Sequence, residues 1–145
     1  MDIIHIAKRV LTEPRAFFKN VGKGKEHLGF AFKYFAVLSL VQTVFSILVG
    51  TIFFSAFQSV MQSFMMSLYG SSPNTFFSPA WMVGNAFFSY VLGLGLSFLF
   101  AGLLHVWILL FGGKQSYVKT YELGAYAGTP AMLLGWIPFL SFAGQ

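Results

Sequence analysis

Cysteine is absent from this 145-residue chain, and charged side chains are scarce. Without cysteine the protein has no disulfide, no thiolate nucleophile and no cysteine-based metal site. Only 9% of the residues are Asp, Glu, Lys or Arg, whereas a soluble domain carries about 25%. Its three histidines and four carboxylates are scattered along the sequence. We therefore predict no metal site and no cofactor.

The missing charge defines one continuous region. Residues 34–113 contain no Asp, Glu, Lys or Arg, and 57% of the whole chain is hydrophobic. Because about 20 apolar helical residues cross a bilayer core, this run predicts several membrane spans. We predict a transmembrane helical domain at 34–145, with spans at about 34–57, 80–111 and 121–140. The predicted fold class is all-α, a polytopic transmembrane helical bundle with an N-terminal amphipathic interfacial helix.

The connection between the first two predicted spans leaves an alternative open. Residues 58–78 contain a Gly-Ser-Ser-Pro-Asn turn, which ends any helix that precedes it. Residues 58–69 are apolar enough either to extend the first span or to lie on the outer membrane surface.

Residues 1–33 form a basic, amphipathic segment. Within residues 2–11, one predicted helical face is apolar. Its residues are Ile3, Ile4, Ala7, Val10 and Leu11. The opposite face carries Asp2, His5, Lys8 and Arg9.

A second short helix is predicted after Thr12, which we expect to be its N-cap, with Pro14 in the first turn. Phe17, Phe18 and Val21 share its apolar side. Two placements of these helices remain open: they lie in the cytoplasmic membrane interface, or they dock on the protein's own spans.

The distribution of basic residues predicts the orientation. Seven of the nine Lys and Arg precede the first span, and the other two lie between the second and third spans. By the positive-inside rule, the N-terminus and the turn at 112–120 are cytoplasmic in a multi-pass protein of the cell membrane. The net charge of +5 is then attributed to topology and to anionic lipid headgroups rather than to nucleic acid.

Small residues recur at helical spacing in every predicted span. The first span has Ser39, Thr43, Ser46 and Gly50, and the second has Ser89, Gly93, Ser97, Ala101 and His105. The third begins with Gly124 and Gly128 in a GxxxG pattern, and Pro130 is expected to bend or unwind it. Because lipid tails are as apolar as leucine, such faces indicate where membrane helices pack against one another.

His105 and Glu122 are the candidate intramembrane polar site. An ionisable side chain within a span is either functional, as a proton relay or ligand site, or a neutral group bonded to a neighbouring hydroxyl. From membrane depth we expect a neutral His105, bonded to Tyr126, Thr129 or a carbonyl freed by Pro130.

For Glu122 the alternatives are an ion pair with Lys119 or a favourable charge at a helix N-terminus. No catalytic set is recognisable, and Gly112-Gly113-Lys114 lacks the remainder of a phosphate-binding loop. We therefore predict no enzyme. The predicted function is a membrane scaffold or interaction module that engages lipids, other membrane proteins or a second copy. The alternative is a small transporter or channel with a polar path near His105 and the Pro130 break.

The stretch GGKQSYVKTYELGAYAGTP at 112–130, followed by GWIPFL, resembles the Yip domain family of integral membrane proteins, especially its bacterial and archaeal branch. The N-terminal TEPRAFFKNV is similar to the segment that precedes the first span in that family. The resemblance covers nearly the whole chain. The matching positions are Gly112, Gly113, Lys114, Tyr117, Thr120, Tyr126, Ala127 and Pro130. These positions other than Ala127, together with Gly124, Gly128 and Thr129, are the expected structural or interaction motif.

The resemblance implies a polytopic membrane protein without an assigned biochemical activity. Members typically have five spans, so this chain looks truncated after the third. The acidic cytoplasmic region and the Asp-Leu-Tyr-Gly-Pro motif of eukaryotic members are absent. An association with Rab-type GTPases is therefore not implied.

Overall fold

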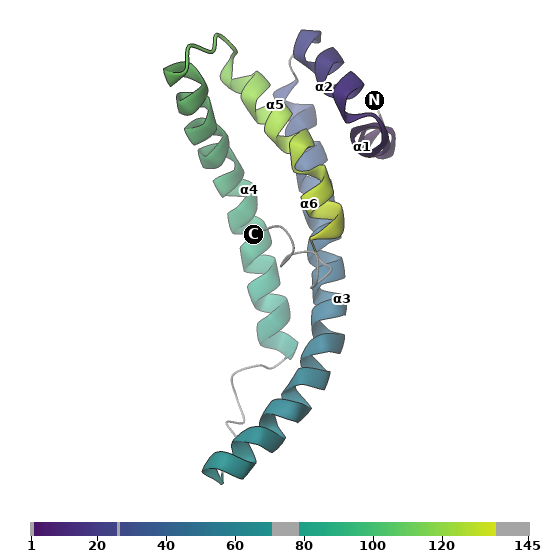
Figure 1. The fold of residues 1–145 in the computed structure, drawn as a ribbon, viewed down its shortest axis with the longest axis vertical. Coiled ribbons are helices and arrows are strands. Elements are labelled where there is room, and N and C mark those ends of the chain that lie inside the picture. The colour runs from purple at the N-terminus through teal and green to yellow at the C-terminus, as the bar shows by residue number, and fades with distance from the viewer. Residues whose placement is uncertain (1, 26, 71–78, 136–145) are drawn as a thin grey trace.

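The structure is a computed structural model that describes residues 2–25, 27–70 and 79–135, and no strand occurs among them (Figure 1). Two short helices, α1 (Ile3–Thr12) and α2 (Pro14–Lys23), precede two long ones, α3 (Leu28–Tyr69) and α4 (Pro79–Leu110). The described chain then forms α5 (Tyr117–Ala127) and α6 (Thr129–Leu134). The all-α prediction is confirmed.

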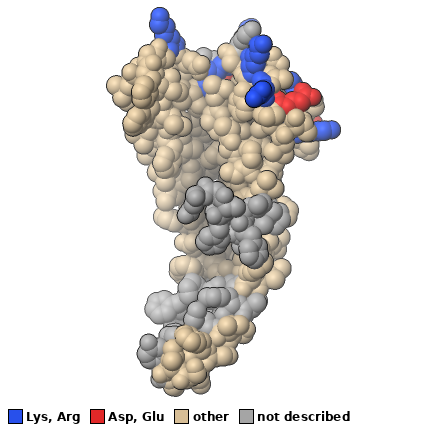
Figure 2. Space-filling view, in the orientation of Figure 1, with Lys and Arg blue, Asp and Glu red and all other residues tan. Residues whose placement is uncertain are grey.

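The long helices α3 and α4 run in opposite directions, and α5 and α6 lie beside α3 and run in the same direction as α3 (Figure 1). Helix α5 also contacts α4, so it packs against both long helices. Helices α1 and α2 lie at the end where α3 begins and α4 ends (Figure 1). Most of the basic side chains gather at this same end (Figure 2).

Both long helices are apolar enough to cross a membrane, over Leu28–Phe53 and Ala80–Leu110. Only 6% of each apolar window is buried inside the protein. Side chains such as Leu48, Phe88 and Leu104 are more than half exposed. A surface this apolar is stable against lipid and would be a liability in water, so these helices correspond to the first two predicted spans.

Helix α3 begins before the first predicted span and continues beyond it. Helix α3 starts at Leu28 rather than at 34, and Lys33 lies exposed within its first turns. A long Lys stem can reach the interface from inside a helix. Residues 58–69 are helical, because α3 continues to Tyr69 and ends at Gly70, whose φ is 65°. Both placements of 58–69 relative to the membrane stay predictions. The 42 residues of α3 span about 63 Å, roughly twice the bilayer core.

The third predicted span is described only in part. Helices α5 and α6 are separated at Gly128, and Pro130 occupies the first turn of α6. The expected interruption near Pro130 is therefore confirmed. Residues 136–140 of the predicted span lie outside the described residues.

The N-terminal helices dock on the protein itself. Ile6, Val10 and Phe17 are buried in one apolar cluster with Tyr34, Leu38 and Tyr126. Phe18 and Val21 are half-buried against that cluster, as the predicted apolar side of α2 requires. The docked alternative is confirmed, and the expected faces need only local correction.

The apolar face of α1 is centred one residue away from its predicted position. Ile6 is buried, whereas Ile4 and Leu11 are 79% and 48% exposed. The expected N-cap was also wrong, because Thr12 ends α1 and donates its hydroxyl to the Lys8 carbonyl at 3.0 Å. Glu13 takes the N-cap position of α2, and Pro14 is in its first turn as expected.

Candidate functional site: a polar helix junction at the charged end

Gly112 and Gly113 end α4, the first because its backbone has a positive φ and the second because a side chain there would clash. Gly112 has a φ of 81°, which residues with a Cβ rarely adopt. The Gly112 N–H donates to the Leu109 carbonyl at 3.0 Å, and the Gly113 N–H donates to the Ile108 carbonyl at 2.8 Å. These two bonds form a Schellman motif. A Cβ on Gly113 would lie 2.8 Å from the Ile108 oxygen, so a larger residue there would clash.

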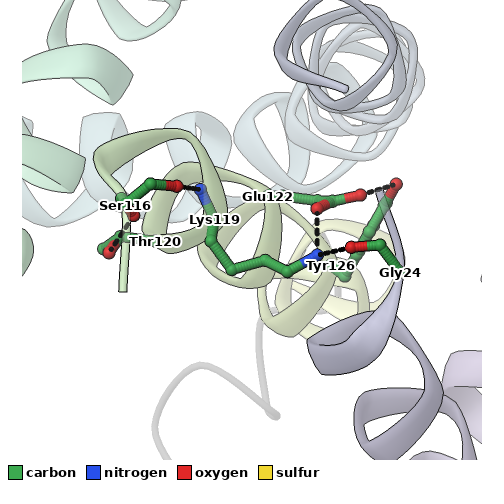
Figure 3. Close-up of polar contacts among 6 residues, drawn as sticks. All are labelled: Gly24, Ser116, Lys119, Thr120, Glu122 and Tyr126. Carbon is green, nitrogen blue, oxygen red and sulfur yellow. Dashed lines mark hydrogen bonds and ion pairs between the residues drawn. The ribbon is translucent and has the colours of Figure 1, made fainter. Parts of the chain in front are cut away.

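Helix α5 begins with a side-chain cap. The Ser116 hydroxyl accepts a hydrogen bond from the Lys119 N–H at 3.1 Å (Figure 3). The preceding Lys114 is exposed, as expected for a side chain that extends toward headgroups. The turn therefore fixes both where α4 ends and where α5 starts.

One face of α5 binds α4 through hydroxyl groups. Tyr117 donates to the Phe98 carbonyl at 2.9 Å, and Tyr121 bonds to the Ser97 hydroxyl at 3.0 Å. The Tyr121 ring stacks on Phe98 with centroids 4.9 Å apart. In this way the Tyr117 position of the motif joins the two helices.

His105 belongs to this α4-facing side. Its Nδ1 lies 3.0 Å from the Thr120 hydroxyl, which donates to the Ser116 carbonyl at 3.2 Å. A hydroxyl has one hydrogen to donate, so both bonds coexist only when His105 Nδ1 carries a proton and donates to Thr120. The ring also meets Tyr117 edge to face at 5.8 Å.

The expected partners of His105 were wrong. Depth along the membrane places Tyr126 and Thr129 near it, but helix phase does not. Thr129 lies nine residues after Thr120, which is about two and a half turns and places it on the opposite side of an α-helix. Tyr126 and Thr129 accordingly contact α3 and the N-terminal helices.

The opposite face of α5 holds a buried ion pair (Figure 3). Lys119 Nζ lies 3.0 Å from Glu122 Oε2, and the two residues are 4% and 5% exposed. The same Nζ donates to the Gly24 carbonyl at 3.3 Å, just after α2 ends. The ion-pair alternative for Glu122 is confirmed, and the pair additionally ties α5 to the N-terminal segment.

Tyr126 and Thr129 extend this face toward α3. The Tyr126 hydroxyl donates to Glu122 Oε1 at 3.5 Å, and its ring meets Phe17 and Tyr34 edge to face. The Thr129 hydroxyl donates to the Tyr126 carbonyl at 2.6 Å and lies 2.7 Å from the Tyr34 hydroxyl. Because the Thr129 hydrogen is already used, Tyr34 is the donor to Thr129.

This arrangement resolves the backbone problem that Pro130 creates. A residue with an N–H at 130 would bond to the carbonyl four residues earlier, at Tyr126, but proline has none. The Thr129 hydroxyl supplies the missing hydrogen bond, and Thr129 is fully buried. Pro130 and Thr129 therefore act together. Pro130 leaves the Tyr126 carbonyl without its usual N–H partner, and the Thr129 hydroxyl donates to that carbonyl instead.

The GxxxG pattern does not mark a close helix crossing. A Cβ on Gly124 would meet nothing within 4 Å, and Gly124 lines a cavity of about 330 Å³. A Cβ on Gly128 would meet Met132 of the same helix pair at 3.0 Å. Close contact is provided instead by buried alanines. They are Ala31, Ala101 and Ala125.

The small-residue faces of the first two spans do face each other, but across open space. Ser39, Thr43 and Ser46 on α3 line a cavity of about 400 Å³ together with Ser89 and Gly93 on α4. The hydroxyls of Ser39 and Thr43 donate to carbonyls of their own helix. The prediction of helix-facing sides was right, and the prediction of tight packing there was wrong.

Several residues of the site were not singled out from the sequence. Tyr34, Tyr121 and Ser116 each supply a hydrogen bond between elements or cap a helix. For Tyr34 and Tyr121 the available signal is a hydroxyl inside a predicted span, because it requires a partner in lipid. Among the described residues, no three His, Asp or Glu side chains form a group suited to a metal ion.

Two long apolar helices that face outward, joined at one end by buried polar contacts, define an integral membrane protein. The chain belongs to the Yip1 domain family, whose model matches residues 8–145. No curated protein and no solved structure matches it. The family prediction is thus confirmed, and the bacterial and archaeal branch stays a prediction.

Proposed function

We propose that the protein is a non-catalytic scaffold or interaction module of the cell membrane, with its N-terminus in the cytoplasm. The observation that carries this proposal is the buried join between the N-terminal segment and α5. Lys119 binds Glu122 and the Gly24 carbonyl at once, beneath docked helices α1 and α2. A module of this kind presents a fixed surface at the membrane rather than a reactive group.

The chemistry of the join supports binding over catalysis. Lys119 and Glu122 are the oppositely charged side chains of the site, and they form an ion pair with each other at 3.0 Å. Separating them inside the protein would leave a buried charge, which is strongly unfavourable. His105 bonds to Thr120 on the α4-facing side of α5, whereas the carbonyl beside the Pro130 break accepts from Thr129, so the contacts found do not favour the transport alternative.

Orientation follows from the charged end of the molecule. Basic side chains gather over α1, α2 and the turn between α4 and α5 (Figure 2). Cysteine labelling tests this cleanly because the chain has no cysteine of its own. In intact cells, Lys23→Cys and Ser116→Cys should resist a membrane-impermeant maleimide, and Ser72→Cys should react. The opposite labelling pattern would overturn the proposed topology.

Site-specific crosslinking tests the interaction role. A photoreactive amino acid at Ile4, which is 79% exposed on docked α1, should give discrete protein adducts in intact cells. The same amino acid at Leu99, exposed on the apolar surface of α4, is the control and should give lipid adducts. Equal adducts at both positions would contradict a specific surface on the N-terminal helices.

Liposome flux separates the proposal from transport. The purified full chain should leave ion and small-solute permeability at the level of protein-free liposomes. A flux that His105→Leu abolishes would contradict the scaffold and establish a conducting role for that side chain.

A further inference from the structure

A cavity of about 890 Å³ lies at the charged end, between the N-terminal helices, the start of α3 and α5. Its volume is within the range of about 300–1,000 Å³ that is typical of small-molecule sites. It is more than twice the volume of the cavity between α3 and α4. The scaffold role described above does not by itself require such a space.

The walls of the cavity are divided by polarity. The apolar wall consists of Ile6, Phe17, Val21, Leu28 and Phe30. The basic side consists of Arg9, Lys25 and His27. The Arg9 guanidinium lies 5.8 Å from the centre of the Phe17 ring, at the boundary between the two parts. A ligand that fills this space needs both an apolar part and an anionic part.

Among the described residues that line the cavity, the net charge is positive. Glu122 also lines it, but its carboxylate is compensated by Lys119 at 3.0 Å. Arg9 and Lys25 form no ion pair with a carboxylate among the described residues. Two cations beside one compensated acid favour an anionic ligand.

The start of α3 also lines the cavity, beside these charges. His27 is the N-cap and forms no side-chain cap, and Gly29 in the first turn lines the cavity. N–H groups in the first turn of a helix have no acceptor within that helix. These N–H groups belong to residues that line the cavity, so they suit an anionic ligand as Arg9 and Lys25 do.

We propose that this cavity binds one anionic phospholipid from the cytoplasmic leaflet. Arg9 and Lys25 hold its phosphate, and an acyl chain lies against Phe17 and Phe30. The cavity adjoins the point where the apolar helix α3 begins, which is where headgroups lie in the proposed topology, on which this inference rests. Basic pockets beside spans on the cytoplasmic side are suited to lipid headgroups.

Native mass spectrometry of the full chain, purified in detergent with equal phosphatidylglycerol and phosphatidylcholine, tests the site. The wild type should retain one phosphatidylglycerol in preference to phosphatidylcholine. Arg9→Gln with Lys25→Gln should lower that retention by roughly tenfold or more, since each cation contributes on the order of a few-fold to tenfold near a membrane surface. Arg15→Gln with Lys19→Gln removes the same charge from exposed positions outside the cavity and should retain the lipid.

A space-filling variant tests the cavity independently of charge. Gly29→Leu places a side chain where a Cβ would meet nothing within 4 Å, and it raises helix propensity. It should reduce lipid retention without loss of folding. Gly22→Leu is the matched control, because Gly22 on α2 also has open space and does not line the cavity.

Three outcomes would overturn the proposal. They are no preference for phosphatidylglycerol, equal losses in both charge-neutralised double variants, and full retention by Gly29→Leu. If millimolar inorganic phosphate or glycerol phosphate displaced the bound phosphatidylglycerol, the cavity would be assigned to a soluble anion. That result would also overturn the proposal that it binds a phospholipid. If the wild type shows no lipid selectivity but gives discrete protein adducts at Ile4, only the lipid-binding inference is rejected. If it shows lipid selectivity but gives no such adducts, only the proposed interaction surface is rejected.

Discussion

Replacing Thr129 with valine should destabilise the protein more than replacing its partner Tyr34 with phenylalanine. The Thr129 hydroxyl satisfies two groups, accepting from Tyr34 at 2.7 Å and donating to the Tyr126 carbonyl at 2.6 Å. Tyr34 and Thr129 are both fully buried. Valine at 129 therefore leaves two buried polar groups, the Tyr34 hydroxyl and the Tyr126 carbonyl, with fewer hydrogen bonds. Phenylalanine at 34 removes one bond, and the Thr129 hydroxyl keeps its bond to the Tyr126 carbonyl.

The magnitudes follow from the cost of buried polar groups. Tyr34→Phe removes one hydrogen bond, about 1 kcal/mol, because Thr129 still donates to the Tyr126 carbonyl. Thr129→Val strands the Tyr34 hydroxyl and leaves that carbonyl only the contact from the Gly128 N–H. At about 1–2 kcal/mol for each affected group, we expect a loss of about 2–3 kcal/mol. The double variant should cost less than the sum.

Pro130→Ala supplies a specific rescue. Alanine restores an N–H that can donate to the Tyr126 carbonyl, so its effect should be more favourable by about 1 kcal/mol in the Thr129→Val background than in the wild type. The comparison between backgrounds cancels the effect of proline on the unfolded chain. It isolates the coupling between positions 129 and 130.

Reversible unfolding by SDS in mixed micelles, followed by circular dichroism, measures these differences. Thr43→Val is the control, because that hydroxyl donates only to the Ser39 carbonyl within its own helix; we expect a loss below about 1 kcal/mol. Equal costs for Thr129→Val and Tyr34→Phe, or a Pro130→Ala effect independent of background, would refute the reasoning.

Two further predictions concern the two faces of α5. Lys119→Met should cost about 3–5 kcal/mol, because it leaves the Glu122 carboxylate buried without its cation, and adding Glu122→Gln should recover part of that loss; SDS unfolding of the single and double variants measures this, and no recovery would contradict a pair that acts as a unit. His105→Phe and Thr120→Val should each lower the thermal midpoint in detergent, with a double variant that costs less than the sum. Additive losses would show that the bond between His105 and Thr120 contributes no coupling. Tyr126→Phe is the control and should combine additively with His105→Phe, because the Tyr126 hydroxyl bonds to Glu122.

Hydrophobic pattern was sufficient to predict the long elements. Residues 34–113 have no charge, and the helices found there are the two that could cross a membrane. The same pattern could not locate the start of α3, because Lys33 lies within the helix while its side chain remains exposed. Charge therefore marks the end of a lipid-compatible surface more reliably than the end of a helix.

Site prediction failed where it used distance along the helix without helix phase. His105 was correctly expected to need a polar partner, but its partner is Thr120 rather than Tyr126 or Thr129. Which face of a helix meets which neighbour depends on tertiary packing that one sequence does not reveal. The ion pair between Lys119 and Glu122 was predictable because it lies within one helix at a spacing of three residues.

The same dependence explains why α5 matters more than its hydropathy suggests. Among the described helices, only α3 and α4 are long and apolar enough to cross a membrane. The polar residues that lower the hydropathy of α5 are the ones that join it to α4 on one side and to α2 on the other. In a lipid environment the hydrophobic effect does not favour one helix neighbour over another, whereas close packing and interhelical hydrogen bonds do. The polar residues of α5 therefore add specific contacts to the close packing of the buried alanines.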